Sequence, residues 1–571
     1  RDVLGSRGLG DVYKRQHLYD VEFCFETDGK VTDKTSFKSG VRQMTYSEET
    51  YKPSGGMSVG SFGQSEPQRL SLFINGRRFI GFGGNWGFGE SNLNYREREY
   101  DIAVAYHADM NFTMIRNWVG QIGDKEFYEA CDRHGIMVWQ DFWLANPVDG
   151  PNPYYTEMFN ANACDYLKRI RNHPSIGIYV GRNEGNPPAG IDDYLRGLVF
   201  REHPGLYYIS NSAMGVVSGG GPYRALSPKS YFQSYGHDKF HSERGMPNVM
   251  NYESMLLTFG TDKIEPVNTS ETPNPVYGLH DYTLGGGKGS SAQAASSFND
   301  MIEKAFGRPR DAKQFAEWAQ WINYDGYRAI FEGRSEHRRG MLLWMSHSAW
   351  PSMVWQTYDY YFDPNAAYFG CKKASEPLHI QWNPLRDDIE VVNYHAFDRT
   401  GLTATASLFN QDGTLQWTRE TKLDIKEDQT VACFPLEQPE TLSDTYFIKL
   451  SLTDSDGKQL SDNFYWRGKE DGNYKSLLQL PKVSVCKNVT VKKTGKEWLI
   501  RAVLKNEART PALMLRLKVA GEKSGRMLLP VFYSDNYFSL LPGEVKEVDI
   551  RLYDADTYGE KPVLEVLGFN L

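Results

Sequence analysis

Residues 176–184 read Ile-Gly-Ile-Tyr-Val-Gly-Arg-Asn-Glu, a short apolar run that ends in polar and acidic side chains. A continuous apolar run of this length is typical of a buried strand in a parallel sheet. Similar runs recur between residues 79 and 350, and amphipathic segments with helical periodicity separate them. This alternation predicts parallel strands joined by crossover helices.

Eight runs of this kind are strand candidates. They span Phe79–Trp86, Thr113–Trp118, Met137–Phe142, Ile176–Asn183, Tyr207–Ser212, Tyr231–Ser234, Phe240–Glu243 and Met341–Ser346. The helices predicted between them include Arg96–Ala108, Lys125–His134, Cys164–Arg171 and Ala312–Glu332. Eight βα units over about 280 residues predict a (β/α)8 TIM barrel, in which functional side chains lie at the carboxyl ends of the strands.

The chain before the barrel has a different pattern. Residues 1–16 contain neither Met nor a regular apolar period, and we expect a non-native or disordered leader there. Residues 17–66 hold two or three strand-like runs and a linker rich in Gly, Ser and Pro. We interpret them as the remnant of an immunoglobulin-like β-sandwich, truncated at its start, with a flap on the barrel as the alternative. Asn75-Gly76 predicts a type I′ hairpin that plugs or introduces the barrel.

The chain after residue 370 loses the helical pattern. Alternating runs with turns at Asp412-Gly413 and Asp456-Gly457 are followed by a second such set from Val483 to Leu571. Runs of this kind are typical of β-sandwiches. We therefore predict a barrel over residues 67–370 and two immunoglobulin-like β-sandwich domains over 371–470 and 471–571.

Composition narrows the class of partner. The 571 residues are 40 % hydrophobic, enough for several packed cores, and carry a net charge of -8. That charge gives no basic surface for nucleic acid, and no run of about 18 apolar residues predicts a membrane span. Six widely spaced cysteines are expected to be free thiols. No His and Cys cluster has metal-ligand spacing, so we expect no metal and no cofactor.

Two glutamates end predicted strands. Glu184 directly follows the fourth, and Glu243 closes the seventh. Because the carboxyl ends of barrel strands meet at one face, we expect these side chains to share a cleft. Glycoside hydrolysis requires such a pair, in which one carboxyl protonates the leaving oxygen and the other attacks the sugar or activates water. The pattern indicates a glycosidase whose Glu184, facing a second negative charge, has a raised pKa.

Further motifs accompany the two glutamates. They are Phe82-Gly83-Gly84-Asn85-Trp86, Met114-Ile115-Arg116-Asn117-Trp118, Arg171-Asn172-His173-Pro174-Ser175, Gly221-Pro222-Tyr223, Trp350-Pro351-Ser352 with Trp355-Gln356, the run from Lys372 to His379, and the run from Ser534 to Glu544. On these motifs, residues 17–571 resemble glycoside hydrolase family 2, in the branch of exo-β-glucosaminidases, β-mannosidases and plant-type mannosylglycoprotein endo-β-mannosidases.

The resemblance implies a retaining double displacement. Glu243 matches the nucleophile and Glu184 the acid/base, with their carboxyls about 5 to 5.5 Å apart. Arg116 would hold Glu243 ionised, and Asn183 would bind the substituent at the 2-position of the sugar. The remaining candidates for the sugar pocket, each with core packing as its alternative, are Trp344, Trp86, Trp118, His280 and Tyr282.

The resemblance also bears on specificity. Exo-glucosaminidases of the branch carry an Asp at the acid/base position, whereas this chain has Asn183-Glu184, which is closer to the mannosidase form. We therefore expect a β-mannoside-like or related hexoside as substrate, with glucosaminidase or galactosidase specificity as alternatives. The resemblance further implies a periplasmic or secreted protein, and an N-terminal domain that contributes to the substrate pocket.

The sequence leaves one other class of function open. The chain could be a carbohydrate-binding fragment that uses its aromatic cleft without turnover. A nucleotide site is not expected, because the run from Gly285 to Ser290 lacks the spacing and the ending of a phosphate-binding loop. We interpret that run as a mobile loop.

Overall fold

The computed structural model describes residues 17–50, 68–233, 239–284 and 295–571. The predicted leader over 1–16, most of the predicted linker and the glycine-rich run from Gly285 lie outside these ranges. The chain divides into two compact units, which are described separately. The first comprises residues 1–221, 234–244 and 337–345, and the second comprises the rest.

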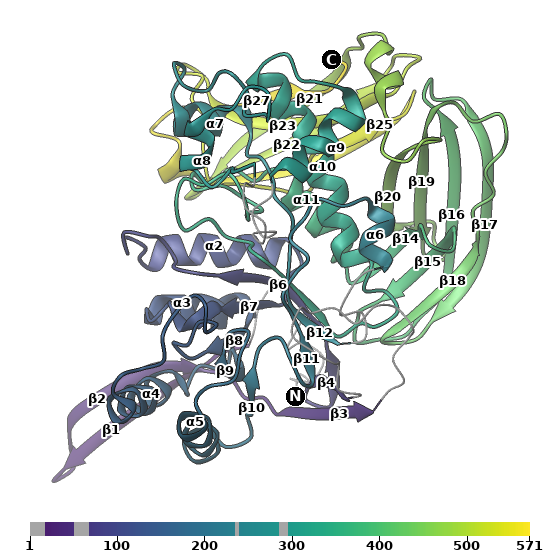
Figure 1. The fold of residues 1–571 in the computed structure, drawn as a ribbon. Helices are drawn as coiled ribbons and strands as arrows, with labels where there is room; N and C mark the ends of the chain where they lie inside the picture. The colour runs from purple at the N-terminus through teal and green to yellow at the C-terminus, as the bar shows by residue number, and fades with distance from the viewer. Residues whose placement is uncertain (1–16, 51–67, 234–238, 285–294) are drawn as a thin grey trace. The chain divides into compact units, whose positions relative to one another are not determined.

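The first unit contains a sheet of eight parallel strands, drawn in Figure 1. In chain order these are β6 Gly81–Trp86, β7 Met114–Asn117, β8 Met137–Asp141, β9 Ile176–Arg182, β10 Tyr207–Asn211, β11 Val217–Ser218, β12 Phe240–Arg244 and β13 Gly340–Leu343. They pair in the order β10-β9-β8-β7-β6-β13-β12-β11, each neighbour parallel to the next. The barrel strands are therefore present, and β9 and β12 are the fourth and seventh along the chain, as predicted.

The predicted sixth strand is wrong. Residues 228–233 form helix α6 (Pro228–Gln233), and Ser234 lies outside the described residues. Pro228 suits the first turn of a helix, where its missing N–H leaves no helical hydrogen bond unmade. The sixth strand is instead Val217–Ser218, only two residues long. A strand this short has no period that a sequence pattern could reveal.

Side chains from around the sheet meet in one apolar core. The buried cluster contains Met114, Met137, Trp139, Ile178, Val180, Ile209, Val217, Phe240 and Leu342. Several of these residues begin their strands, so the cluster fills the amino-terminal end of the barrel. Glycine permits close approach here, because a Cβ on Gly83 would lie 1.6 Å from the carbonyl oxygen of Met114.

A small antiparallel sheet closes this end of the barrel. It consists of β3 (Met44–Thr50), β4 (Gln68–Ile74) and β5 (Arg77–Phe79), and it contributes Met44, Leu70, Leu72, Ile74 and Phe79 to the same cluster. Asn75 and Gly76 have φ values of 50° and 78°, so the predicted hairpin with two positive-φ residues is confirmed. Because β3 pairs with β4, the predicted boundary near residue 66 runs between two strands of one sheet.

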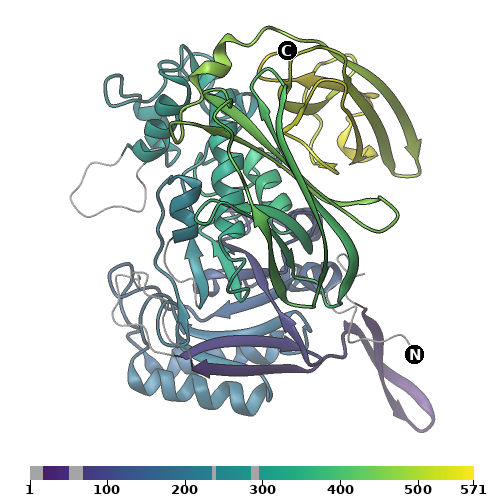
Figure 2. The ribbon, with the colours of Figure 1, turned by 90° about the vertical axis from the view of Figure 1, so that its right-hand side faces the viewer.

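Strands β1 (Tyr19–Thr27) and β2 (Lys30–Ser39) form a separate two-stranded ribbon, visible in Figures 1 and 2. The α-helices among the described residues of the first unit are α2 Glu97–Asp109, α3 Lys125–His134, α4 Thr156–Ile170 and α5 Ala189–Glu202. Helix α4 starts earlier than predicted, and α3 ends at Gly135, whose φ of 71° suits a glycine cap. Figure 1 shows α2 and α3 side by side.

The second unit contains helices and two sandwiches. Its helices are α6 Pro228–Gln233, α7 Tyr252–Phe259, α8 Pro275–Leu279, α9 Ser296–Phe306, α10 Ala312–Glu332 and α11 Ala366–Ala374. Helix α10 is where the sequence predicts it, and the side chain of Asp311 caps it by accepting from the amide of Gln314 at 2.8 Å. No helix within the described ranges has the length and apolar character that a membrane crossing requires.

Each sandwich is built from two antiparallel sheets, in agreement with the predicted fold class. In the first, β14 Leu378–Asn383, β15 Asp388–Asn393 and β18 Gln429–Pro435 face β17 Leu415–Ile425, β16 Arg399–Asn410, β19 Thr445–Thr453 and β20 Gln459–Gly468. The second comprises β21 Val485–Thr494, β22 Glu497–Asn506, β26 Val545–Tyr553 and β24 Val531–Tyr533 in one sheet, and β25 Phe538–Leu540, β23 Ala512–Gly521 and β27 Pro562–Leu567 in the other.

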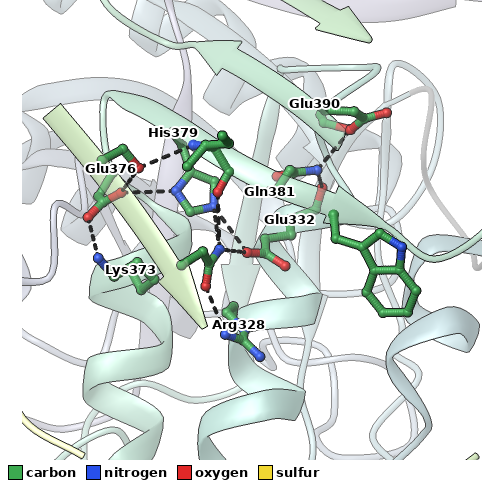
Figure 3. A network of polar contacts seen from close by, with 12 residues as sticks. Arg328, Glu332, Lys373, Glu376, His379, Gln381 and Glu390 are labelled. Atoms are coloured by element: carbon green, nitrogen blue, oxygen red, sulfur yellow. Dashed lines mark hydrogen bonds and ion pairs between the residues drawn. The ribbon is translucent and has the colours of Figure 1, made fainter. Parts of the chain in front are cut away.

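A buried polar network ties helix α10 to the first sandwich within the second unit (Figure 3). Glu332 of α10 accepts from Tyr465 and Asn463, each at 2.8 Å, and contacts His379 Nε2 at 3.0 Å. The other ring nitrogen of His379 lies 3.0 Å from Glu376, which pairs with Lys373. Burial alone would lower the pKa of His379, but hydrogen bonds to the two glutamates raise it. The imidazolium form therefore fits between the two carboxylates.

Candidate active site

Four strands of the first unit deliver polar side chains from their carboxyl ends. Arg116 lies on β7, Asp141 on β8 and Glu243 on β12, while Asn183 follows β9. All four are at most 3 % exposed. Side chains at this face of a parallel barrel are the ones available for chemistry.

Arg116 is the centre of this group. Its Nη1 donates to Glu243 Oε1 at 2.7 Å, and its Nη2 donates to Asn183 Oδ1 at 2.8 Å. Its Nε and Nη2 both donate to Asp141, the shorter contact being 2.7 Å. Burial alone would lower the pKa of Arg116, but Asp141 and Glu243 raise it above its ordinary value. The predicted contact between Arg116 and Glu243 is present, and it stabilises an ionised Glu243.

Asp141 fixes the arginine in turn. Besides the guanidinium it accepts from the indole of Trp139 at 2.9 Å and from the backbone amide of Val119 at 3.0 Å. Asp141 therefore binds the edge of the Arg116 guanidinium that is formed by Nε and Nη2. Nη1 is left to bind Glu243, and Nη2 also donates to Asn183. Sequence reasoning missed Asp141, although an acid at the end of the third predicted strand has the same position as the two glutamates on theirs.

The orientation of Asn183 follows from its partners. A guanidinium only donates, so the atom that faces Arg116 is the carbonyl oxygen Oδ1. Ser212 Oγ lies 3.4 Å from the same oxygen, and the backbone amide of Asn183 donates to Leu144. The side-chain NH2 group consequently points away from Arg116, as a donor that can meet a ligand.

Glu184 differs from its neighbours because its side chain is only half-buried. Its backbone has a positive φ of 47°, and its amide donates to Ser212 Oγ at 3.0 Å. The carboxyl has one long contact, from Asn146 Nδ2 at 3.4 Å. Burial, and then the negative charge of Glu243, raise the pKa of Glu184 to about 7. The predicted direction of this shift is confirmed. Asn183, the residue before Glu184, shares Arg116 with Glu243, so the two glutamates lie at one site.

Two tryptophans follow strands of the same unit. Trp118 follows β7 and Trp344 follows β13, and their rings meet edge to face with centroids 4.9 Å apart. Both are partly exposed. The backbone amide of Trp344 donates to the carbonyl of Arg244, the residue after Glu243, at 3.0 Å. The structure therefore brings Trp344 to the strand that carries Glu243.

The other aromatic candidates make their contacts within their own units. Trp86 is fully buried, packs against Phe127 of α3 and donates to His107 of α2 at 3.0 Å, so it points into the layer between strands and helices. Tyr282 belongs to the second unit, where it is fully buried and its hydroxyl donates to Asn299 at 2.7 Å. His280, in the same unit, contacts the carbonyl of Pro351 and stacks on Trp350.

Other side chains support the group, although none of them was predicted as a site residue. Asn85 on β6 donates from its Nδ2 to the carbonyls of Ser242 and Leu343, both at 2.9 Å, and so joins β12 to β13 beside Glu243. Ser212 at the end of β10 supports both Asn183 and Glu184. Across the described ranges, no group of three or more His, Cys, Asp or Glu side chains could hold a metal ion.

Known proteins resemble the chain over its whole length. A model of the exo-β-D-glucosaminidase Ig-fold domain matches residues 463–571. A mannosylglycoprotein endo-β-mannosidase of Lilium longiflorum is 26 % identical, over 97 % of this chain and 68 % of the relative. An exo-β-D-glucosaminidase of Amycolatopsis orientalis is 27 % identical, over 100 % of this chain and 57 % of the relative. The chain thus spans 57 to 68 % of the length of these curated relatives.

Among solved structures, an exo-chitosanase of Amycolatopsis orientalis superimposes with a TM-score of 0.85 at 24 % identity, over 99 % of this chain and 69 % of that one. The barrel, the sandwiches and the carboxyl pair at the strand ends define the architecture of a TIM-barrel glycoside hydrolase. Within that class, the curated relatives of the chain are named exo-β-D-glucosaminidases, β-mannosidases and mannosylglycoprotein endo-β-mannosidases, the same branch of glycoside hydrolase family 2 that the sequence motifs resemble.

Proposed function

We propose that this chain is a retaining β-glycoside hydrolase that cleaves β-mannosides or related β-hexosides from glycans or oligosaccharides. The observation that carries the proposal is the contrast within the carboxyl pair. Glu243 is buried and accepts a hydrogen bond from Arg116 at 2.7 Å, whereas Glu184 is half-buried and its pKa is raised to about 7. One group is suited to remain ionised and the other to deliver a proton near neutral pH.

The two steps follow from these states. The Glu243 carboxylate attacks the anomeric carbon, the bond to the leaving oxygen breaks, and Glu184 gives that oxygen its proton. Water then attacks the glycosyl ester of Glu243, Glu184 takes a proton from the water, and the carboxylate of Glu243 departs. Two inversions at one carbon give net retention.

The neighbouring groups have positioning roles in this proposal. Arg116, fixed by Asp141, aims Glu243, and the NH2 group of Asn183 donates to the substituent at the sugar's 2-position. Trp344 forms the aromatic platform under the sugar, with Trp118 against its edge. Trp86 and Tyr282 are assigned to packing, because both are fully buried with hydrogen-bond partners in the protein.

Residue identity favours the β-mannoside class, since the acid/base position holds Glu184 after Asn183. Relatives named for mannosidase and for glucosaminidase activity both match the chain, so the panel of test substrates covers both. We also infer that a domain boundary near residue 370 separates the barrel from the first sandwich, and that one near residue 470 separates the two sandwiches.

The test uses aryl β-mannoside, β-glucosaminide, β-galactoside and β-glucuronide. Glu243→Ala should abolish turnover of the accepted glycoside, and azide should restore it as the α-glycosyl azide, formed by attack on the face that Glu243 vacates. Glu420→Ala, a change at an exposed glutamate of the first sandwich, is the matched control and should behave as the unaltered chain. Turnover that survives Glu243→Ala without azide would disprove the proposal. Binding of these sugars without any turnover would favour a carbohydrate-binding function.

A further inference from the structure

A group of exposed apolar side chains lies on the segment between β8 and α4 and on the first turn of α4. Tyr154 is 90 % exposed and Tyr155 71 %, and Val148 and Met158 are 94 % and 62 % exposed. Large aromatic side chains normally bury most of their area, so two adjacent exposed tyrosines mark a surface for binding. Among the described residues, neither tyrosine ring makes a ring contact and neither hydroxyl a hydrogen bond.

This segment is fixed to the end of the strand that leads to Glu184. Arg182, on β9, donates to the carbonyl of Ala145 at 2.7 Å and to the side chain of Asn152 at 2.8 Å. The backbone amide of Asn183 donates to the carbonyl of Leu144 at 2.9 Å. Two residues of extended chain span about 7 Å, so Tyr154 is held close to the anchored Asn152.

The same segment touches the acid group itself. Asn146 donates to Glu184 Oε2 at 3.4 Å, and its Oδ1 accepts from the amides of Val148 and Asp149, both at 2.9 Å. This side-chain turn sets the direction of the chain as it leaves Glu184. The exposed tyrosines are therefore attached to the acid side of the carboxyl pair.

Resting on the function proposed above, we propose that Tyr154 and Tyr155 bind the leaving-group sugars of an oligosaccharide substrate. The acid must lie beside the oxygen it protonates, so the departing sugars extend past Glu184 and away from Glu243. Aromatic rings stack on the apolar faces of sugar rings, and tyrosine adds a hydroxyl for the sugar's own hydroxyls. The preferred substrate is then a chain with sugars on the leaving side rather than a simple glycoside.

The experiment compares two substrates that carry the same transferred sugar. One is an oligosaccharide with two sugars on the leaving side, and the other is the glycosyl fluoride, whose leaving group needs neither a sugar site nor a proton from Glu184. The double change Tyr154→Ala with Tyr155→Ala should lower kcat/KM for the oligosaccharide about tenfold or more. The rate on the fluoride should stay within about twofold, because the bonds to the transferred sugar are unchanged.

Two further variants make the result specific. The double change to Phe keeps both rings and should retain most of the activity on the oligosaccharide. Phe200→Ala removes an equally exposed ring, 78 % exposed on α5, and should affect neither substrate. Equal loss on both substrates, or no loss on either, overturns the proposal while leaving the carboxyl pair in place. If the unaltered chain does not hydrolyse the fluoride, the proposed function fails and this inference fails with it.

Discussion

Two buried arginines of this molecule organise polar networks of nearly the same composition. Arg116 on β7 gathers Asp141, Glu243 and Asn183 at the ends of barrel strands. Arg328 on α10 donates to Asp325 and Asn463 in the network of Figure 3, which continues through Glu332 to His379. Each combines a guanidinium with carboxylates and an amide, and in each the arginine is at most 1 % exposed.

The two networks differ in how many hydrogen bonds their carboxylates accept. Around Glu332 the carboxylate has three partners from two strands, and the exposed fraction of every group is close to zero. In the Arg116 network, Asn183 is followed directly by Glu184, whose side chain is half-buried and whose backbone φ is positive. The Glu184 carboxyl has one long hydrogen bond, from Asn146. A carboxyl with few donors beside a second carboxyl favours its neutral form. The first arrangement serves structure, and the second keeps a proton available.

The largest expected effect separates the two arginines by function. Arg116→Gln should lower kcat by about a thousandfold or more, because Glu243 loses the charge that keeps it ionised and Asn183 loses its orientation. Arg328→Gln should leave kcat unchanged below its unfolding temperature. Steady-state rates on the accepted aryl glycoside, with circular dichroism to show that each variant is folded, decide the matter. A comparable loss of kcat in both variants would contradict the contrast.

The second effect is expected in the Glu332 network, and it is on stability and not on the rate. Glu332→Ala should lower the free energy of unfolding by about 3 kcal/mol, since His379 and Asn463 remain buried with one partner fewer. Denaturation in urea measures it, and Glu420→Ala gives the baseline for an exposed glutamate. The rate at a temperature where the protein remains folded should be unaffected. A change in kcat without a change in stability would mean that this network acts on the site.

The third effect is on the pH dependence of the rate. Because the acid must be protonated, kcat/KM should decline as pH rises through about 7, the pKa of Glu184. Asp149 raises this pKa and the hydrogen bond from Asn146 lowers it, so Asp149→Asn should move the decline to lower pH and Asn146→Ala to higher pH. A pH profile for each variant measures the shift. If both variants shift the decline the same way, Glu184 does not set it.

The sequence could predict the barrel because seven of its strands are runs of apolar residues long enough to be recognised. The sixth, Val217–Ser218, is too short, and the aromatic run at Tyr231 proved to be part of a helix. The two glutamates could be located because position at a strand end is a property of the sequence. The resemblance to known enzymes supplied Arg116 and Asn183.

Other features of the site depend on which way a side chain points. A barrel strand is buried on both faces, so a pattern cannot tell that Trp86 faces the helices while Asn85 bridges neighbouring strands. Asp141 and Ser212 contribute to the site through hydrogen bonds with residues more than twenty positions away in the chain. Such contacts exist only once the strands are placed side by side, which no local pattern encodes.

The smallest expected effect is on stability against pH, and it distinguishes two groups whose pKa is raised. An unfolded Glu titrates near 4.3 and folded Glu184 at about 7, so the folded state binds more protons between these values and stability falls as pH rises. Glu184→Gln should remove this loss, giving a gain in the free energy of unfolding of about 1 kcal/mol at pH 8, after allowance for solvent screening, and none at pH 4.

His379 contributes stability that is fully present below about pH 6.5 and is lost as pH rises through its raised pKa. His379→Gln should therefore cost stability at pH 5 and less at pH 9. Unfolding in urea at these pH values measures the stability change of both variants. If His379→Gln stabilised the protein, or if Glu184→Gln destabilised it at pH 8, the distinction between the structural network and the reactive one would not hold.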